Sequence, residues 1–461
     1  MYYLAEGGSS LDAPRLVHQL LKRVTGDFEK NLADELLDTL FNKTFAEVKD
    51  FLSTAHHIIS KSCTNSTYLT KRNEAVRIHK DKGYCDAFVY ARFIIVSPAQ
   101  DQILHELSKL AKVWCLNLEK CIDSSPTVYV ISPRAAIIYI GSHSGLFVAI
   151  DFITGSLIWK YVLPDRIESS ACLVTTRSKG VLVLIGCYDH HLYAFDAFNG
   201  KLLSSFKSTG PIKCTPIFDS TTRNVWFGCH GNTLYCLDYS EDNPMVVFKM
   251  EFGASIFSSC SLSATHVVAC AISGEMVSIC KETFKLSWDR GFYPSLTKKP
   301  IFSTPLIFST SIIVASVDGF VYCYSVGSDI PVMKWKYDTG GPCFSSPVYM
   351  CDVGIGLVCI GSHSGFVHFI RVVTGEFYAK IKYDSAIFAT PCCTLNQMTC
   401  VSTSGQLKSV QFGDNAEFVC RNYQIKGQCF SSGLMIGKWF LQANRNDTIE
   451  LIDSDDWKIG L

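Results

Sequence analysis

The sequence has no excess of charge of either sign and no long apolar run. Its 461 residues include 42 Lys and Arg against 42 Asp and Glu, so the formal net charge is zero. A balanced charge argues against broad binding to nucleic acid or to an anionic membrane surface. No uninterrupted apolar stretch reaches the roughly 18 residues that a membrane helix requires. We therefore expect neither a nucleic-acid partner nor a membrane span.

Several signature motifs are also missing. The chain has no G-x-x-x-x-G-K-[ST] phosphate loop and no recurring C-x-x-C pairs at zinc spacing. Its first eight residues lack the basic and apolar regions of a signal peptide. The 21 cysteines are scattered through apolar runs, as at Cys236, Cys270, Cys323, Cys359 and Cys400, which is typical of small buried hydrophobes in a reducing compartment. These absences predict a cytoplasmic protein that uses no metal.

What the sequence does contain is a repeat. A Ser or Thr followed by Pro or a small residue recurs every 42 to 45 residues. A fixed period of this size indicates one supersecondary unit repeated side by side. The eight starts are Ser125-Pro126, Ser170-Ala171, Thr215-Pro216, Ser259-Cys260, Thr304-Pro305, Ser346-Pro347, Thr390-Pro391 and Ser432-Gly433.

Each repeat is predicted to be one propeller blade. In the first unit, four β-prone runs cover residues 127–130, 136–140, 146–150 and 157–161, joined by short turns that contain glycine. Four strands in about 44 residues with such hairpins are typical of a blade. Proline fits the start of a first strand because its missing N–H is harmless there. The sequence therefore predicts a mainly β fold with eight blades, or seven in the alternative interpretation.

The run Val113 to Leu116 stands before the first repeat at the same distance as the fourth strand around Trp159 stands before the second repeat. It therefore has the position of a fourth strand. The last unit, from Ser432 to Ile452, has only three good strands and a short remainder around Trp457. We expect the early strand to complete the last blade. This pairing would close the ring and remove both exposed edges.

The stretch Ala149-x-Asp151-x-x-Thr154-Gly155-x-x-x-Trp159 resembles the quinoprotein-type repeat, and residues 194–200 resemble a partial second copy. The resemblance covers roughly residues 110–461 and implies the fold. Some quinoprotein dehydrogenases also have vicinal cysteines, as at Cys392-Cys393, but we interpret these as residues at the start of a strand. We expect no pyrroloquinoline quinone, and a quinone-dependent dehydrogenase is the least favoured function.

Histidines recur in the predicted turns. His143 and His363 occupy equivalent turns, with His190, His191 and His230 in similar ones. A metal would need three or four converging ligands. We interpret these histidines as polar turn residues, and we assign no catalytic or metal-binding residue to the propeller.

The segment before the propeller has a different pattern. After Ser10, apolar residues from Leu11 to Val24 follow helical spacing. A Gly-Gly loop that leads to a serine at a helix start favours an anion there, although Ser10 as a simple helix cap is an alternative. The motif Gly7-Gly8-x-Ser10-Leu11 resembles the phosphopantetheine attachment motif of acyl and peptidyl carrier domains. The resemblance implies 4'-phosphopantetheine bound covalently to Ser10, with Gly7, Gly8 and Leu11 as the surrounding motif.

Residues 39–52 resemble the last helices of the carrier family. Only nine residues precede Ser10, so the first carrier helix is missing and we expect a truncated carrier domain. We assign residues 1–57 to this helical carrier-like domain, 58–109 to a linker and entry segment, and 110–461 to the propeller. The polar and basic stretch 60–84 is interpreted as linker, with a contact for an acidic partner as the alternative.

A carrier joined to a quinoprotein-like propeller resembles the C-terminal part of the β-alanine-activating enzyme family, also described as acyl-CoA synthetase family member 4. In that family an adenylation domain activates an acid with ATP and loads it onto the carrier thiol. The sequence contains none of that domain, so an adenylation domain or enzyme and a phosphopantetheinyl transferase are the implied partners. The resemblance implies that the chain holds an acyl or aminoacyl thioester for an unknown acceptor. The alternative is a non-catalytic scaffold that binds a partner protein on a propeller face and has an inert carrier remnant.

Overall fold

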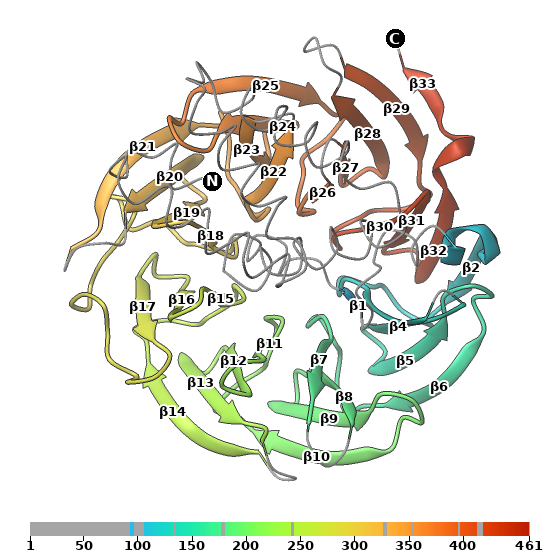
Figure 1. Cartoon of the computed structure of the whole chain (residues 1–461), viewed down its shortest axis with the longest axis horizontal. Helices are drawn as coiled ribbons and strands as arrows, with labels where there is room; N and C mark the ends of the chain where they lie inside the picture. Colours follow the sequence, from blue (N-terminus) through green and yellow to red (C-terminus); the bar gives the residue numbers. More distant parts are fainter. Residues whose placement is uncertain are drawn as a thin grey trace, which may run out of the picture. The chain divides into compact units, whose positions relative to one another are not determined.

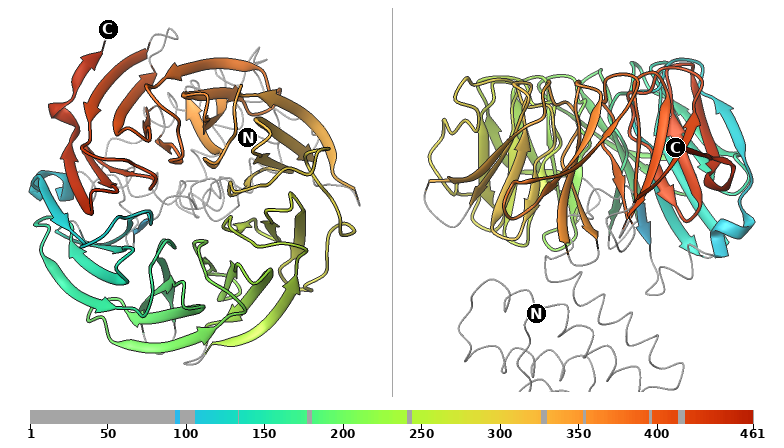
Figure 2. Two further views of the ribbon diagram at one scale, coloured as in Figure 1. Left: turned by 180° about the vertical axis from the view of Figure 1, so that it is seen from behind. Right: turned by 90° about the horizontal axis from the view of Figure 1, so that it is seen from above.

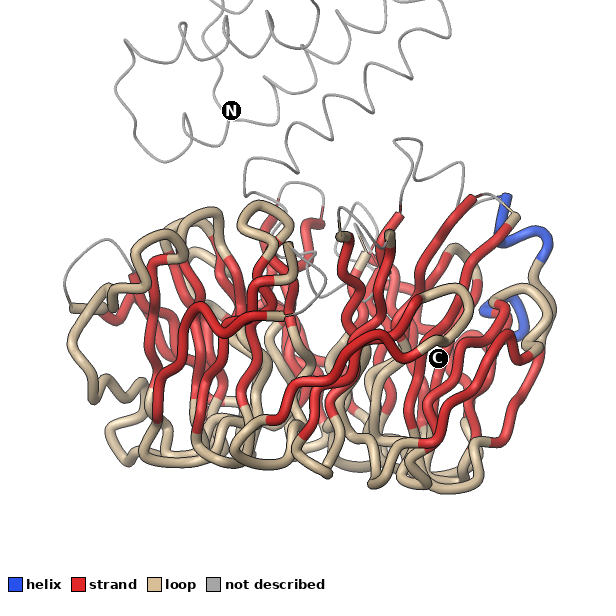
Figure 3. The backbone as a smooth tube through the Cα atoms, turned by 90° about the horizontal axis from the view of Figure 1, so that it is seen from below, coloured by secondary structure: helices blue, strands red, loops and turns tan. Residues whose placement is uncertain are grey.

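The computed structural model describes residues 93–95 and 106–460, with gaps at 133, 177–179, 241–243, 326–329, 353–354, 395–396 and 413–417. Eight β-sheets stand around a common axis like the blades of a propeller (Figure 1). Their strands run across the thickness of the disc, and loops cover its two faces (Figures 2 and 3). The eight-bladed fold predicted from the repeat is confirmed. The predicted carrier-like segment 1–57, including Ser10, lies outside the described residues.

Successive antiparallel hairpins build the blades, each from the axis outward. The first four blades contain β3 (Thr127–Ser132), β4 (Ala135–Gly141), β5 (Leu146–Asp151), β6 (Leu157–Val162); β7 (Cys172–Thr175), β8 (Val181–Gly186), β9 (His191–Asp196), β10 (Leu202–Lys207); β11 (Ile217–Asp219), β12 (Asn224–Gly228), β13 (Thr233–Asp238), β14 (Met245–Glu251); and β15 (Ser261–Leu262), β16 (His266–Cys270), β17 (Met276–Cys280). The next three contain β18 (Leu306–Phe308), β19 (Ser311–Ala315), β20 (Phe320–Ser325), β21 (Val332–Asp338); β22 (Val348–Asp352), β23 (Ile355–Gly361), β24 (Phe366–Arg371), β25 (Phe377–Lys382); and β26 (Cys392–Cys393), β27 (Gln397–Val401), β28 (Gln406–Phe412), β29 (Phe418–Gln424).

The eighth blade joins the two ends of the propeller. It contains β30 (Leu434–Ile436), β31 (Trp439–Ala443) and β32 (Thr448–Asp453), and its outer strand is β2 (Trp114–Asn117). Trp114 pairs with Leu451 and Asn117 with Thr448 in antiparallel register. The predicted closure by the early strand is therefore confirmed.

Three details of the sheets go beyond the regular repeat. Blade 4 has three named strands, and the edge of β17 is covered by an irregular segment through the Ile279–Leu286 bridge and the bond from Ser287 N to Ser278 O (2.8 Å). The short remainder after β32 forms a 3-10 turn, Ser454–Asp456, and then β33 (Lys458–Gly460), which pairs with β29 of blade 7. Strand β1 (Phe93–Ile95) adds to blade 1 as a parallel neighbour of β3.

The middle strands form the core. The apolar run of β4 is buried along nearly its whole length, as expected for a strand covered on both faces. Cys236, Cys270, Cys323, Cys359 and Cys400 are each at most 2% exposed, so their predicted role as small buried hydrophobes is confirmed. No helix in the described part of the chain is long and apolar enough to cross a membrane.

In several blades, a tryptophan of the outer strand packs against the next blade. The Trp159 indole N–H donates to Ala197 O and that of Trp335 to Val372 O, both at 3.0 Å, and Trp114 contacts Phe152 O in the same way. A glycine lies under each ring. At Gly155, for example, a side chain would not fit, because a Cβ there would stand 2.5 Å from Trp114. This contact explains why both a glycine and a tryptophan recur in the quinoprotein-type repeat, since each glycine lies under the tryptophan of the blade before it.

Substituting Gly155 tests this docking, with Gly180 as the matched control. Both have a positive φ, of 72° and 75°, but a Cβ at Gly180 meets nothing within 4 Å. We expect Gly180→Ala to cost about 1 kcal/mol of unfolding free energy from backbone strain alone. Gly155→Ala should cost a further 1–3 kcal/mol, roughly, because it displaces Trp114. Urea unfolding midpoints measure the difference, and equal losses for the two variants would argue against docking.

Candidate functional site

Eight side chains at equivalent positions form a ring around the propeller axis on one face. Each stands two residues before the Ser or Thr that starts a repeat, in the link that leads into the innermost strand. The residue before it is a buried Ile or Cys in every blade, and the ring residue itself is half-buried. We call this set the axial ring; it consists of Asp123, Glu168, Lys213, Phe257, Phe302, Phe344, Phe388 and Phe430.

Five consecutive members of the axial ring are phenylalanines. From Phe257 to Phe430, neighbouring ring centroids lie 5.2, 5.2, 4.9 and 4.8 Å apart, within the range of favourable aromatic pairs. His363 lies against two of them, 4.5 Å from Phe344 and 4.3 Å from Phe388. Blades 4 to 8 thus present a continuous aromatic arc.

A second set of residues lies beside the axial ring, in the turns between the second and third strands. In every blade the backbone N–H of this turn residue donates to a carbonyl two positions before the axial-ring residue, at 2.8–3.2 Å. The turn residues are His143, Tyr188, His230, Ile272, Val317, His363, Thr403 and Arg445. The predicted equivalence of His143 and His363 is seen, and His230 shares it. His190 and His191 stand later, because Tyr188 holds this position in blade 2.

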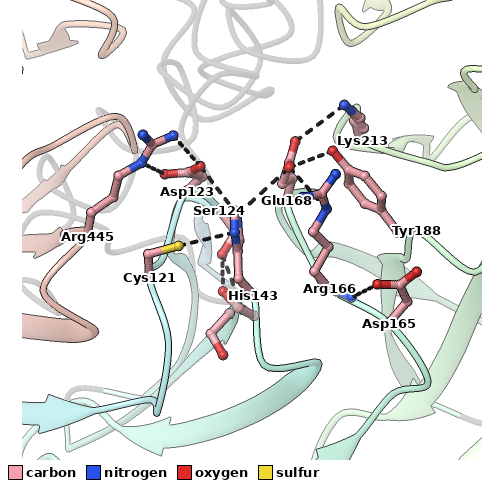
Figure 4. A network of polar contacts seen from close by, with 12 residues as sticks. Cys121, Asp123, Ser124, His143, Asp165, Arg166, Glu168, Tyr188, Lys213 and Arg445 are labelled. Atoms are coloured by element: carbon pink, nitrogen blue, oxygen red, sulfur yellow. Dashed lines mark hydrogen bonds and ion pairs between the residues drawn. The ribbon is translucent and has the colours of Figure 1, made fainter.

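The charged members occupy the remaining sector, at the junction of blades 8, 1, 2 and 3 (Figure 4). Arg445 binds Asp123 with two parallel bonds of 2.8 and 2.7 Å and stacks 3.7 Å over the ring of Phe430. Glu168 accepts from Tyr188 Oη at 2.5 Å and lies 3.8 Å from Lys213 Nζ. Lys213 faces Phe257 at 5.8 Å, so the contacts run around the whole ring.

His143 stands between the two carboxylates of this sector. Its Nε2 lies 3.3 Å from Asp123 Oδ2 and 3.8 Å from Glu168 Oε1, ion-pair distances at which neither oxygen is aligned for a strong hydrogen bond. Its Nδ1 lies 3.1 Å from Cys121 Sγ. Cys121, His143 and Asp123 are therefore joined in one line of contacts.

Local charges set the protonation of these groups. Burial alone would raise the pKa of Asp123, but the imidazole of His143 close by and the hydrogen bonds and charge of Arg445 outweigh it and hold the pKa at about 2. Burial, followed by the charge of Asp123, raises the pKa of the Cys121 thiol, while Arg445 acts in the opposite direction. Burial and then the charge of Lys213 lower the pKa of His230 to about 4.

The other predicted site residues are placed as follows. Ser10, Gly7, Gly8 and Leu11 lie outside the described residues, so the phosphopantetheine site stays a prediction. Cys392 and Cys393 form the short first strand of blade 7, where the predicted strand start is seen. Within the described ranges, no group of three or more His, Cys, Asp or Glu side chains could hold a metal ion.

Sequence reasoning missed the axial ring, although a signal for it exists. When the eight repeats are aligned on their Ser or Thr, the position two residues earlier is charged in the first three repeats and phenylalanine in the other five. The contact of Asp123 with Arg445 has no such signal, because the two residues are 322 positions apart.

The geometry defines a closed eight-bladed propeller that has a ring of five phenylalanines and three charged residues on one face. A family model described as the β-propeller of the beta-alanine-activating enzyme matches residues 118–453, and the chain belongs to this family. The beta-alanine-activating enzyme of Drosophila melanogaster is 26% identical over 93% of this chain and 41% of its own length. The Homo sapiens enzyme of that name is 34% identical over 29% of this chain and 12% of its own length. The chain thus spans about two-fifths of the Drosophila relative.

Solved structures support the fold alone. BamB from Moraxella catarrhalis superposes with a TM-score of 0.57 at 15% identity, covering 76% of this chain and 99% of its own. Saccharomyces cerevisiae Sqt1 gives 0.57 at 8% identity, covering 74% of this chain and 97% of its own.

The Arg445–Asp123 pair predicts a pH-dependent contribution to stability. Because the folded pKa of Asp123 is held below the ordinary value of about 3.9, the carboxylate stabilises the fold above that value and loses this effect as the pH falls toward 2. Asp123→Asn should therefore cost about 2 kcal/mol at pH 6, and the difference from wild type should shrink below pH 4. Chemical unfolding at several pH values measures it.

Glu376→Gln is the control for that measurement, since its pair with Arg371 is long (3.9 Å) and exposed. Such surface pairs contribute little, so this variant should differ from wild type by less than about 1 kcal/mol at every pH. An Asp123→Asn cost that did not change between pH 6 and pH 3 would contradict the assigned role of the carboxylate.

Proposed function

We propose that this chain is the carrier-plus-propeller portion of an ATP-dependent enzyme that activates an acid or amino acid of the β-alanine type. An acyl or aminoacyl group would be held as a thioester on a phosphopantetheine arm at Ser10, while the propeller binds the partner or acceptor. The observation that carries the proposal is the family of the propeller. The Drosophila alignment supports it further, because it covers more of the chain than the propeller alone and so includes part of the preceding segment.

The composition of the described region suggests where this protein works. None of its eighteen described cysteines is in a disulfide, and twelve of the eighteen are buried. A cytoplasmic, reducing location agrees with this usage. An adenylation domain or a separate adenylating enzyme would supply the activated acyl group, and a phosphopantetheinyl transferase would modify Ser10.

A scaffold function is the second candidate, and the aromatic arc favours it. Five half-buried phenylalanines on one face are a surface suited to a partner with apolar side chains. If the propeller acts only as a scaffold, the same partners should co-purify with the wild-type chain and with Ser10→Ala. They should be lost on Phe388→Ala, since Phe388 lies between Phe344, Phe430 and His363.

The carrier proposal is tested by coexpressing the full chain with a phosphopantetheinyl transferase and measuring its intact mass. The wild-type chain and Ser9→Ala should both gain one phosphopantetheine, and Ser10→Ala should gain none. Ser9 is the matched control because it is the neighbouring hydroxyl. No increment on wild type, or an increment that persists in Ser10→Ala, would contradict Ser10 as the attachment site.

A further inference from the structure

The line of contacts from Cys121 through His143 to Asp123 has the order of a nucleophile, a base and a carboxylate. We propose that Cys121 is an acceptor of an aminoacyl group, which it takes from a thioester with His143 as general base. This inference rests on the proposed function and deepens it, because it names the acceptor thiol and the class of acyl group.

The backbone fixes Cys121 and His143 in register. The N–H of His143 donates to Cys121 O at 3.0 Å, and the side chains meet again at 3.1 Å between Nδ1 and Sγ. The same backbone bond joins Pro211 to His230 and Pro342 to His363. In those blades a proline replaces the cysteine, so of the three histidine-bearing turns only that of blade 1 has a nucleophile opposite its imidazole.

The proposed step uses one tautomer of His143. With the proton on Nε2, the imidazole N–H faces Asp123, and Nδ1 is left to accept the proton of the Cys121 thiol. Asp123 remains ionised at neutral pH, since its pKa is about 2, and Arg445 holds it in place with two bonds. The negative charge of the carboxylate, 3.3 Å from Nε2, therefore stabilises the imidazolium that proton transfer produces.

The thiol of Cys121 is protonated at rest, because burial and Asp123 raise its pKa. Its reactivity then depends on a neighbouring base rather than on a preformed thiolate. His143 is in contact with the sulfur, and Cys121 is partly exposed, so the base and an approaching thioester can both reach it. A reaction through Cys121 should consequently require the imidazole.

The charges around Cys121 indicate which acyl group fits. Asp123, Asp447 and Glu168 all act on the thiol as negative charges, and Arg445 is the one cation that opposes them. Arg445 pairs with Asp123, and Arg166 and Lys213 lie 3.7 and 3.8 Å from Glu168, so Asp447 supplies the remaining negative charge beside the sulfur. A positively charged ammonium on the acyl chain is favoured there over a methyl group.

The reaction is an exchange of one thioester for another. His143 Nδ1 takes the Sγ proton, and the sulfur attacks the carbonyl carbon of the incoming aminoacyl thioester. The bond from that carbon to the donor sulfur breaks, and the departing sulfur takes the proton back from the imidazolium. No oxidant, reductant or net proton is consumed.

The chain contains internal reference thiols. Cys115 is exposed in β2, six residues before Cys121, and its pKa is raised by burial and then by Glu450. Cys280 is partly exposed, and hydrogen bonds from Thr283 lower its pKa. Thiol acidity alone would make Cys280 the most reactive of the three.

The experiment exposes the full chain to two free thioesters of similar shape, S-β-alanyl-N-acetylcysteamine and S-butyryl-N-acetylcysteamine, and follows acylation of each cysteine by peptide mass mapping. Cys121 should be acylated at least about tenfold faster than Cys115 and Cys280, and faster by the β-alanyl than by the butyryl compound. Hydroxylamine should remove the label, as expected of a thioester. Because all three thiols are compared in one folded protein, the order of reactivity does not depend on any variant folding.

Variants separate the roles of the three residues. His143→Gln should slow the acylation of Cys121 at least about tenfold and leave Cys280 unchanged. Asp123→Asn should slow both thioesters, whereas Asp447→Asn should reduce only the preference for the β-alanyl compound. Cys115→Ser is the matched control and should leave labelling of Cys121 as in wild type.

Acylation in the order of acidity, with Cys280 first, or no effect of His143→Gln would overturn the role of Cys121. A faster reaction with the butyryl thioester would overturn the aminoacyl class. The Ser10→Ala chain is run in parallel, and there Cys121 should react as in wild type because the thioester is supplied free. If Ser10 is not modified but Cys121 is reactive, only the carrier proposal is refuted. If Ser10 is modified but Cys121 is unreactive, only the role of Cys121 is refuted.

Discussion

The structure depends on a seam of hydrogen bonds between the links that lead into the innermost strands of neighbouring blades. At six junctions, the backbone N–H at the start of one repeat donates to the hydroxyl that starts the next, at 2.9–3.2 Å. One of these bonds, from Ser432 N to Ser125 Oγ, crosses from the last blade to the first. A buried N–H without a partner costs about 1–3 kcal/mol, so each hydroxyl satisfies a donor that the sheet itself leaves unpaired. This is the physical reason for the recurring Ser or Thr in the sequence.

The serine before the pair adds a bond within the blade. Ser303 and Ser431 each donate to the carbonyl that ends the second strand, at 2.7 Å, and Ser258 does the same at 3.0 Å. In those three links, two fixed residues leave little freedom for the residue that precedes them. The axial ring is therefore evenly spaced around the axis, and its chemistry varies freely because its backbone does not depend on it. Five phenylalanines and three charged residues share one geometry.

Much of the architecture could be predicted because it follows from local patterns repeated eight times. Each recurring residue corresponds to one local feature of the blade. These residues are the proline after the Ser or Thr, the glycines of the hairpins and the tryptophan of the fourth strand. Even the closure was predictable, since Trp114 precedes the first repeat by the same distance as Trp159 precedes the second. The irregular edge of blade 4 and the crossing of β33 to blade 7 break the period, and no local pattern announces them. The contacts of Cys121 with His143 and of Asp123 with Arg445 join separate loops, so only the folded ring brings them together.

The position of the charged sector couples it to the closure of the propeller. Strand β2 completes blade 8, and within six residues the same segment supplies Cys121 and Asp123 to the first link of blade 1. Arg445 reaches Asp123 from blade 8, and His143 reaches it from blade 1. The bond from His143 N to Cys121 O lies at the first blade, whereas the pair of Asp123 with Arg445 joins that blade to the last one. Because this pair joins the last blade to the first, it exists only in the closed ring, and the charge balance around His143 depends on that closure.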